Sequence, residues 1–230
     1  MDFSYLDKNI AGVRANMAAA KATSGREDEV TLMAAIKSAD VDEINYLHRE
    51  LGVCDVGENR VQQLLSRYDA LDRENLRIHF IGSLQTNKVK YIVDKVYMIH
   101  SLDSLRLAAE IDKQAKKHGI VMRVLAEVNS GREENKGGLL PEEVEEFCLA
   151  LRDYPNLKLC GFMTMAPKLE HKEEYIKYFQ EFSQLSVDIW TKKLDNKERP
   201  VLSMGMSESY EEAIACGATV VRVGRTLFVK

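Results

Sequence analysis

The chain has 230 residues, of which 45% are hydrophobic and 30% charged, and its formal net charge is −4. This composition is that of a soluble globular protein. The small net charge gives no general attraction to nucleic acid or to an anionic membrane, so any anion site must be local. The cysteines are widely spaced without a CxxC pair, at Cys54, Cys148, Cys160 and Cys216. This spacing disfavours a metal or disulfide site and indicates a reduced cytosolic protein, for which we expect no signal peptide and no membrane span.

The first elements are a helix and a buried strand. Apolar side chains recur at helical spacing over residues 7–21, which predicts an amphipathic helix. The run at residues 31–37 is apolar on both faces, as strands of parallel sheets usually are. Alternation places Met33, Ala35 and Lys37 on one side of this strand.

From Asp40 onward, strands and helices alternate to the end of the chain. Asp40 and Glu43 resemble a capping box that starts the first of these helices. Further strands are expected at residues 53–56, 77–81, 96–99, 121–128, 157–161, 200–203 and 219–223, and longer helices at 84–93, 104–118, 142–151 and 172–193. This alternation favours a single α/β domain over residues 1–230, a (β/α)8 TIM-type barrel with an extra N-terminal helix. A doubly wound open sheet is the alternative.

In such a barrel, the C-terminal ends of the strands meet at one face, where binding sites form. Lys37, Asn59, Ser207, Arg222 and Gly224 all follow or end predicted strands, so this topology makes them neighbours. Lys37 has two interpretations: it either reaches water from the strand end or supplies a functional amine.

Loops after the seventh and eighth strands commonly bind phosphate in these barrels. Ser207 is a plausible N-cap whose helix would present free backbone N–H groups. Gly224 and Arg225 follow the eighth strand in the same way. The acidic residues Glu208, Glu211 and Glu212 would oppose a phosphate if they faced it, but they also complement a helix dipole.

Arg222 lies inside a strand that otherwise reads as buried, and a buried guanidinium needs an acceptor. An ion pair with Glu127 or Asp55 is one interpretation. The other is a ligand-binding role, since Lys37 and Arg222 would be lateral neighbours and a nearby cation favours a neutral, nucleophilic amine. An amine, an anion cradle and an arginine together fit an aldehyde that carries a phosphate, and pyridoxal phosphate is the commonest such molecule.

The histidines show no metal spacing. His79 is expected to be a hydrogen-bonded core residue, and the other histidines fall in helices or at element edges. The polar loop at residues 129–138, which contains Lys136, is either a lid over the site or a solvated loop.

Seven stretches carry a family resemblance: AIK at 35–37, VGEN at 56–59, HFIGSLQTNK at 79–88, NKGG at 135–138, GFM at 161–163, LSMGMS at 202–207 and VRVG at 221–224. In this order they resemble the pyridoxal phosphate homeostasis protein family, also called the proline synthetase co-transcribed homologue family. The resemblance implies a barrel similar to the N-terminal domain of alanine racemase.

The resemblance also implies roles for individual residues. Lys37 would hold pyridoxal 5′-phosphate as a Schiff base, Arg222 would face the pyridine nitrogen, and Asn59 would line the pocket beside the ring. Ser207 and the backbone at Gly224 and Arg225 would hold the phosphate, with Thr226 a weaker candidate. No residue is assigned a catalytic role.

Members of this family are thought to carry, buffer or deliver the cofactor rather than to turn over a substrate. We therefore expect a monomeric, cytoplasmic protein that is not an enzyme, with apo-enzymes as recipients and with neither nucleic acid nor a membrane as a partner. One alternative is an amino-acid racemase, although related racemases use a tyrosine from a second domain. Another is a barrel enzyme that forms a Schiff base between Lys37 and a sugar phosphate.

Overall fold

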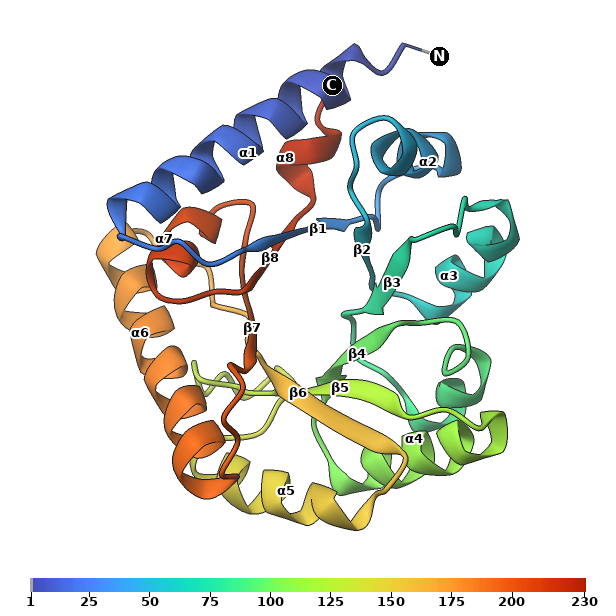
Figure 1. Ribbon diagram of the computed structural model, residues 1–230, viewed down its shortest axis with the longest axis vertical. Coiled ribbons are helices and arrows are strands. Elements are labelled where there is room, and N and C mark those ends of the chain that lie inside the picture. The colour runs from blue at the N-terminus through green and yellow to red at the C-terminus, as the bar shows by residue number, and fades with distance from the viewer. Residues whose placement is uncertain (1) are drawn as a thin grey trace.

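The computed structural model describes residues 2–230, and over these residues eight parallel strands close into a barrel in sequence order (Figure 1). The strands are β1 (Thr31–Ala35), β2 (Asp55–Glu58), β3 (Arg77–Phe80), β4 (Met98–Leu102), β5 (Met122–Glu127), β6 (Leu157–Met163), β7 (Val201–Met206) and β8 (Val220–Val223). β1 pairs with both β2 and β8, so that Met33 lies opposite Asp55 on one side and Arg222 on the other. This closure confirms the predicted barrel and excludes the open sheet.

Helices surround the strands on the outside of the barrel (Figure 1). The α-helices are α1 (Ser4–Thr23), α2 (Val41–Arg49), α3 (Val61–Arg67), α4 (Leu105–His118), α5 (Val144–Ala150), α6 (Lys172–Asp188), α7 (Tyr210–Ala215) and α8 (Arg225–Phe228). α1 is the predicted extra helix, and the Asn9 side chain ties it to the chain end by donating to the carbonyls of Leu227 and Val229 at 3.0 and 2.8 Å. Within residues 2–230, the structure contains no helix with the length and apolar character needed to cross a bilayer.

Local sequence signals explain several helix ends. The capping box predicted at α2 is confirmed: Asp40 Oδ1 accepts from the amide of Glu43 at 2.8 Å, and Glu43 Oε2 accepts from the amide of Asp40 at 2.8 Å. α4 ends at Gly119, whose φ of 65° is the left-handed conformation that glycine adopts at low cost. These contacts satisfy backbone groups that a helix end would otherwise leave free.

Several predicted elements have other bounds or another helix type in the structure, including β2 (predicted at 53–56) and β7 (predicted at 200–203). Residues 84–93 contain a short 3-10 helix (Thr86–Tyr91) instead of an α-helix. The fourth strand begins at Met98 and continues to Leu102, beyond the predicted end. The helix expected to run to residue 193 ends at Asp188 and continues as a π-helix (Ile189–Lys193).

The buried face of α6 leaves one tyrosine at its edge. Tyr175, Phe179, Phe182 and Ser186 are buried, whereas Tyr178 and Leu185 are half-buried at the edge of that face. The hydroxyl of Tyr178 lies 2.7 Å from the hydroxyl of Thr164, just after β6. The tyrosine therefore reaches the end of the barrel with its polar group instead of packing wholly in the core.

Side chains fill two separate layers around the strands. Outward-facing residues such as Ala34 and Val56 pack with the helices in the main hydrophobic core. Inside the barrel, two small apolar clusters form around Met33 and around Leu125. The lumen also holds buried polar residues, each at most 8% exposed: Asp55, His79, His100, Glu127, Ser203 and Arg222.

Candidate functional site

A cavity of about 430 Å³ lies at the C-terminal ends of the strands. It is lined by the six residues that the sequence assigned to a cofactor site, Lys37, Asn59, Ser207, Arg222, Gly224 and Arg225, together with Ala35, Ile81, Met165 and Met206. The barrel topology thus brings together residues that are up to 188 positions apart, from Lys37 to Arg225. Polar groups converge here on an apolar floor, as they do in many small-molecule sites.

Lys37 has an exposed side chain on a firmly held backbone. It follows β1, and its carbonyl accepts from Gln63 Nε2 at 2.8 Å. Arg67 of α3 is buried and donates to the carbonyls of Ile36 and Ala39 at 3.1 and 3.2 Å. The loop that carries the amine is therefore fixed from the helix side, and the amine itself is left to face the cavity.

Glu58 holds the next part of the cavity wall. Its carboxylate is fully buried, pairs with Arg67, and accepts from the backbone amides of Asn59 and Arg60 at 2.6 and 3.0 Å. A Cβ at Gly82 would lie 2.1 Å from the carbonyl oxygen of Asn59, so only glycine allows β3 to pass this close to the turn. These contacts place Asn59 at the cavity.

Ser207 does not cap the following helix, which corrects one prediction. α7 begins at Tyr210, with Ser209 in the preceding position. Ser207 Oγ instead accepts from the backbone amides of Gly224 and Thr226 at 3.3 and 3.4 Å. The hydroxyl and these N–H groups therefore share one corner of the cavity.

The acidic residues near this corner are engaged elsewhere. Glu208 pairs with the Arg225 side chain at 3.0 Å, and Glu212 pairs with Lys172 at 3.2 Å. Because the Arg225 guanidinium points to Glu208, the contribution of Arg225 to an anion site would come from its backbone N–H.

Arg222 has no ion pair among residues 2–230, so the predicted pairs with Glu127 and Asp55 are wrong. Its guanidinium donates to Ser203 Oγ at 2.8 Å and to the carbonyl of Thr164 at 2.9 Å. Burial lowers the pKa of Arg222 to about 10, an effect that nearby Glu127 and Tyr178 oppose. The side chain thus remains a cation at neutral pH and presents donors to the cavity.

Asp55 and the two buried histidines form a connected set. Asp55 accepts from Arg77 at 2.8 and 2.6 Å and from His79 Nε2 at 3.0 Å. Although burial acts to raise it, these bonds lower the pKa of Asp55 to about 2. His79 is a hydrogen-bonded core residue as predicted, but His100 is not at a strand edge: it is fully buried within β4, 2.9 Å from His79.

Glu127 ends β5 inside the lumen, and no hydrogen bond to its carboxylate is found among residues 2–230. Burial raises the pKa of Glu127 to about 7, the charge of Asp103 raises it further, and that of Arg222 opposes the rise. Glu127 is therefore a carboxyl group that titrates near neutral pH beside the buried cation.

The polar loop at residues 129–138 is bonded mainly to itself. Asn129 exchanges hydrogen bonds with the backbone of Glu133 at 3.0 and 3.1 Å. Lys136 pairs with Glu133 at 2.5 Å and is not among the residues that line the cavity.

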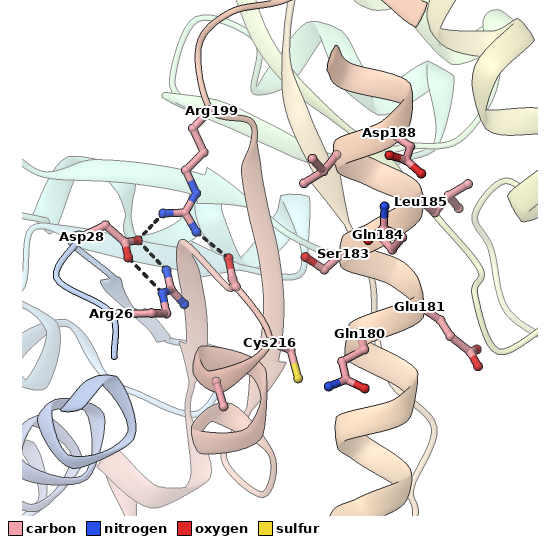
Figure 2. Close-up of a pocket in the computed structure, with 13 residues that line it drawn as sticks. Arg26, Asp28, Gln180, Glu181, Ser183, Gln184, Leu185, Asp188, Arg199 and Cys216 are labelled. Carbon is pink, nitrogen blue, oxygen red and sulfur yellow. Dashed lines mark hydrogen bonds and ion pairs between the residues drawn. The ribbon is translucent and has the colours of Figure 1, made fainter. Parts of the chain in front are cut away.

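A larger hollow of about 1020 Å³ lies against α6, near the start of β1, β7 and β8 (Figure 2). Both of its arginines, Arg26 and Arg199, already pair with the single carboxylate of Asp28 (Figure 2). None of the residues assigned to a site by sequence lies in it. The smaller cavity, which both Lys37 and Arg222 line, is therefore the candidate functional site.

Metal chemistry has no evident site in the described part of the chain. No group of three or more His, Cys, Asp or Glu side chains in residues 2–230 is arranged to hold a metal ion. The cavity is instead suited to an anionic organic ligand.

Known proteins place this chain in a family. The model for the N-terminal domain of alanine racemase matches residues 9–230. A pyridoxal phosphate homeostasis protein of Aquifex aeolicus is 49% identical over 172 residues, which cover 75% of each protein. The chain belongs to the pyridoxal phosphate homeostasis protein family. The family resemblance noted in the sequence is thereby confirmed.

Solved structures agree with this family membership. PipY of Synechococcus elongatus, solved with PLP bound, is 26% identical and superposes with a TM-score of 0.83, covering 97% of this chain and 100% of its own. An alanine racemase of Clostridium difficile shares the fold at 18% identity and a TM-score of 0.73, and the match covers 97% of this chain and 57% of the racemase. The alanine racemase N-terminal barrel predicted for the homeostasis family is confirmed.

Sequence reasoning missed the residues that support the site. Glu58 stood inside the VGEN stretch without an assigned role, and its buried strand-end position was a usable signal for a structural carboxylate. Arg67 lies on a short helix, where an arginine usually faces solvent, so its buried position was not predicted. Ser203 and His100 could not be linked, because nothing in a single sequence shows that β4 and β7 approach each other across the lumen.

Proposed function

We propose that this protein binds pyridoxal 5′-phosphate in the cavity at the C-terminal ends of the strands and serves its intracellular homeostasis. The observation that carries the proposal is the convergence of Lys37, Arg222 and Ser207 on one cavity of about 430 Å³. The names of the curated relatives and the PLP-bound PipY structure support the choice of ligand.

The residues present fit this cofactor. When bound, pyridoxal phosphate supplies an aldehyde, which condenses with a primary amine and releases one water, and an electron-accepting pyridine ring. Lys37 offers the amine, and in our proposal it holds the cofactor as a Schiff base. Ser207 and the backbone N–H groups of Gly224 and Arg225 would bind the phosphate, since such groups suit anions. Asn59 would lie beside the ring.

Arg222 bears on whether the site retains or transforms its ligand. A guanidinium has donors and no acceptor, so it would meet the pyridine nitrogen without protonating it. An unprotonated ring is a weaker electron sink. We therefore propose a non-enzymatic role in which the protein carries, buffers or delivers the cofactor to apo-enzymes.

Absorption spectroscopy tests this proposal. Wild-type protein titrated with pyridoxal 5′-phosphate should gain the visible band of a lysine-bound cofactor, and so should Lys113→Ala, which removes an exposed amine on α4. Lys37→Ala should lack the band. The same band in Lys37→Ala would contradict the assignment, and no band in any of the proteins would contradict the function.

Amino-acid racemisation is a second candidate, favoured by the match to the alanine racemase N-terminal domain. Incubating the loaded protein with several L-amino acids and measuring D-enantiomers separates the two functions. We expect no turnover above that of free cofactor, and sustained production of a D-amino acid would replace homeostasis by catalysis.

Lys136 is a further candidate within this function. An amine in the loop at residues 129–138 could accept the aldehyde from Lys37 and guide its release. A faster or slower cofactor off-rate in Lys136→Ala is the result that this role predicts, and an unchanged off-rate contradicts it.

A further inference from the structure

An unbroken row of hydrogen bonds crosses the barrel lumen from Arg222. The hydroxyl of Ser203 lies 2.8 Å from Arg222 Nη1 and 3.0 Å from His100 Nδ1. His100 Nε2 lies 2.9 Å from His79 Nδ1, and His79 Nε2 lies 3.0 Å from Asp55 Oδ1. These residues come from β8, β7, β4, β3 and β2, so the row connects opposite walls of the barrel.

The two ends of this row lie at different ends of the barrel. Arg222 lines the cavity, whereas Asp55 begins β2 and pairs with Arg77 at the start of β3. The Arg77 side chain is 47% exposed, so this end reaches solvent. His100, His79 and Asp55 do not line the cavity. Any effect they have on it must therefore pass through Ser203 and Arg222.

Hydrogen-bond chemistry gives the row a direction. Arg222 can only donate, and an ionised Asp55 can only accept. His79 must therefore donate from Nε2, which leaves its Nδ1 as an acceptor when the ring is neutral. His100 then donates from Nε2 and accepts at Nδ1 from the Ser203 hydroxyl, whose lone pair accepts from Arg222. Each donor has one acceptor, with both imidazoles neutral and carrying hydrogen on Nε2.

We propose that Ser203, His100, His79 and Asp55 form a directional hydrogen-bond chain that positions Arg222 toward the cavity, which makes His100 and His79 positioning residues for the ligand. The effect on pyridoxal phosphate rests on the proposed function, whereas the direction of the chain does not. No residue of this hydrogen-bond chain is proposed to contact the aldehyde of the cofactor.

Charge and burial explain why this chain matters for Arg222. A buried cation without a carboxylate partner is costly unless dipoles face it. The aligned groups present lone pairs toward Arg222 and hydrogens toward Asp55, and hydrogen bonds in such a row polarise one another. The chain therefore links a buried cation to a distant carboxylate.

The opposite direction satisfies fewer groups. It requires a doubly protonated His79, which adds a second buried cation to the lumen. It also makes Ser203 accept from both Arg222 and His100, and its own hydrogen then has no acceptor in the bonds observed for residues 2–230. Burial lowers the pKa of His100 well below its ordinary value, and the Arg222 cation acts in the same direction, which agrees with a neutral ring there.

Nuclear magnetic resonance tests the direction in protein without added cofactor. Long-range proton–nitrogen spectra of protein labelled with 15N-histidine distinguish the two tautomers, and the spectra of His79→Gln and His118→Gln help to assign the buried and the exposed rings. We expect His79 and His100 to be neutral with hydrogen on Nε2. Hydrogen on Nδ1 of His100, or a doubly protonated His79, would overturn the proposal.

Ligand binding tests the positioning. Asp55→Asn removes the anion that orients the chain, whereas Arg77→Met keeps the carboxylate and removes its exposed partner. We expect Asp55→Asn to raise the Kd for pyridoxal 5′-phosphate about fivefold, as for a weakened buried hydrogen bond to a charged group, and to shift the visible absorption band. Arg77→Met should leave both unchanged, and equal effects in the two variants would contradict the positioning role.

The nuclear magnetic resonance and ligand-binding experiments together distinguish a failure of this inference from a failure of the proposed function. If neither the wild type nor any variant binds pyridoxal phosphate, the proposed function is wrong. The histidine tautomers then still show whether the hydrogen-bond chain has the proposed direction. If the cofactor binds normally but the tautomers differ from those expected, the chain fails and the function stands.

Discussion

The layers of side chains on the two sides of the strands hold different chemistry. Outside, between strands and helices, a large apolar core is buried, together with a smaller number of polar side chains such as Glu58, Arg67 and Gln114. Inside, two carboxyl groups, two imidazoles, a hydroxyl and a guanidinium are buried beside two small apolar clusters. Bulky branched residues usually fill the lumen of such barrels. Burying polar groups costs free energy unless they are bonded. We therefore expect the outer layer to contribute most of the stability of the fold, and the polar lumen to contribute to the proposed ligand binding.

Arg67 is an exception to this division and gives the largest expected effect. It is a charged residue in the outer layer, and Arg67→Met would leave Glu58 buried without its partner while releasing the loop that carries Lys37. Denaturant unfolding should show a loss of about 4 kcal/mol, typical of a broken buried ion pair. The exposed Arg73→Met is the control. A loss of unfolding free energy no larger than that of the control would show that Arg67 is not needed to stabilise the cavity wall at Glu58.

An apolar outer residue should affect stability without affecting binding. Ile111 of α4 is fully buried and lies in the main core. Ile111→Ala should lower the free energy of unfolding by about 3 kcal/mol, as other large-to-small core changes do. Under conditions where the variant is folded, its Kd for pyridoxal 5′-phosphate should equal that of wild type. A changed Kd would show that the outer layer also affects ligand binding.

Glu127 should make the lumen sensitive to pH. Its pKa is raised from 4.5 to about 7 in the folded protein. Below pH 4.5 the carboxyl group is therefore protonated in both the folded and the unfolded state, and it does not lower the free energy of unfolding. Between these values the unfolded state ionises first, and the free energy of unfolding falls until about pH 7, by roughly 3 kcal/mol in total.

The comparison of wild type with Glu127→Gln isolates this effect, since glutamine does not titrate. Unfolding of both proteins, without added cofactor, should be measured from pH 4.5 to 8. The wild type should lose stability relative to the variant as pH rises. A constant difference across this range would mean that Glu127 is ionised throughout.

The smallest effect is expected at the corner formed by Ser207. Ser207→Ala removes a hydroxyl that contacts the amides of Gly224 and Thr226. We expect the Kd for pyridoxal 5′-phosphate to rise about tenfold, corresponding to one lost hydrogen bond to a charged group. Affinity for pyridoxal, which lacks the phosphate, should not change, and an equal loss for both ligands would contradict a phosphate contact.

Much of the outer layer could be predicted because it follows from periodicity. Alternating strands and helices predicted the barrel, and Asp40 with Glu43 predicted the cap of α2. The residues at strand ends, such as Lys37 and Arg222, could be placed at one face by topology. Strand ends were less accurate, as at β4, where the strand continues through the polar residues His100 and Ser101 past the end of the apolar run.

Contacts across the lumen could not be predicted in the same way. Arg222 was expected to need an acceptor, but a carboxylate was assumed where a serine hydroxyl and a carbonyl serve. The predicted fourth strand ends at residue 99 and so places His100 at a strand edge, whereas β4 continues to Leu102. Ser207 was taken for a helix cap because it precedes a helix, whereas its hydroxyl turns to the next strand's loop. Such partners depend on three-dimensional proximity, which local sequence does not encode.

Reductive trapping tests the central claim most directly. Wild-type protein is mixed with one equivalent of pyridoxal 5′-phosphate, reduced with borohydride, digested, and mapped by mass spectrometry. We expect the pyridoxyl group on the peptide that contains Lys37. Labelling distributed over surface lysines, or confined to another lysine such as Lys136, would contradict the assignment of the polar cavity as the cofactor site.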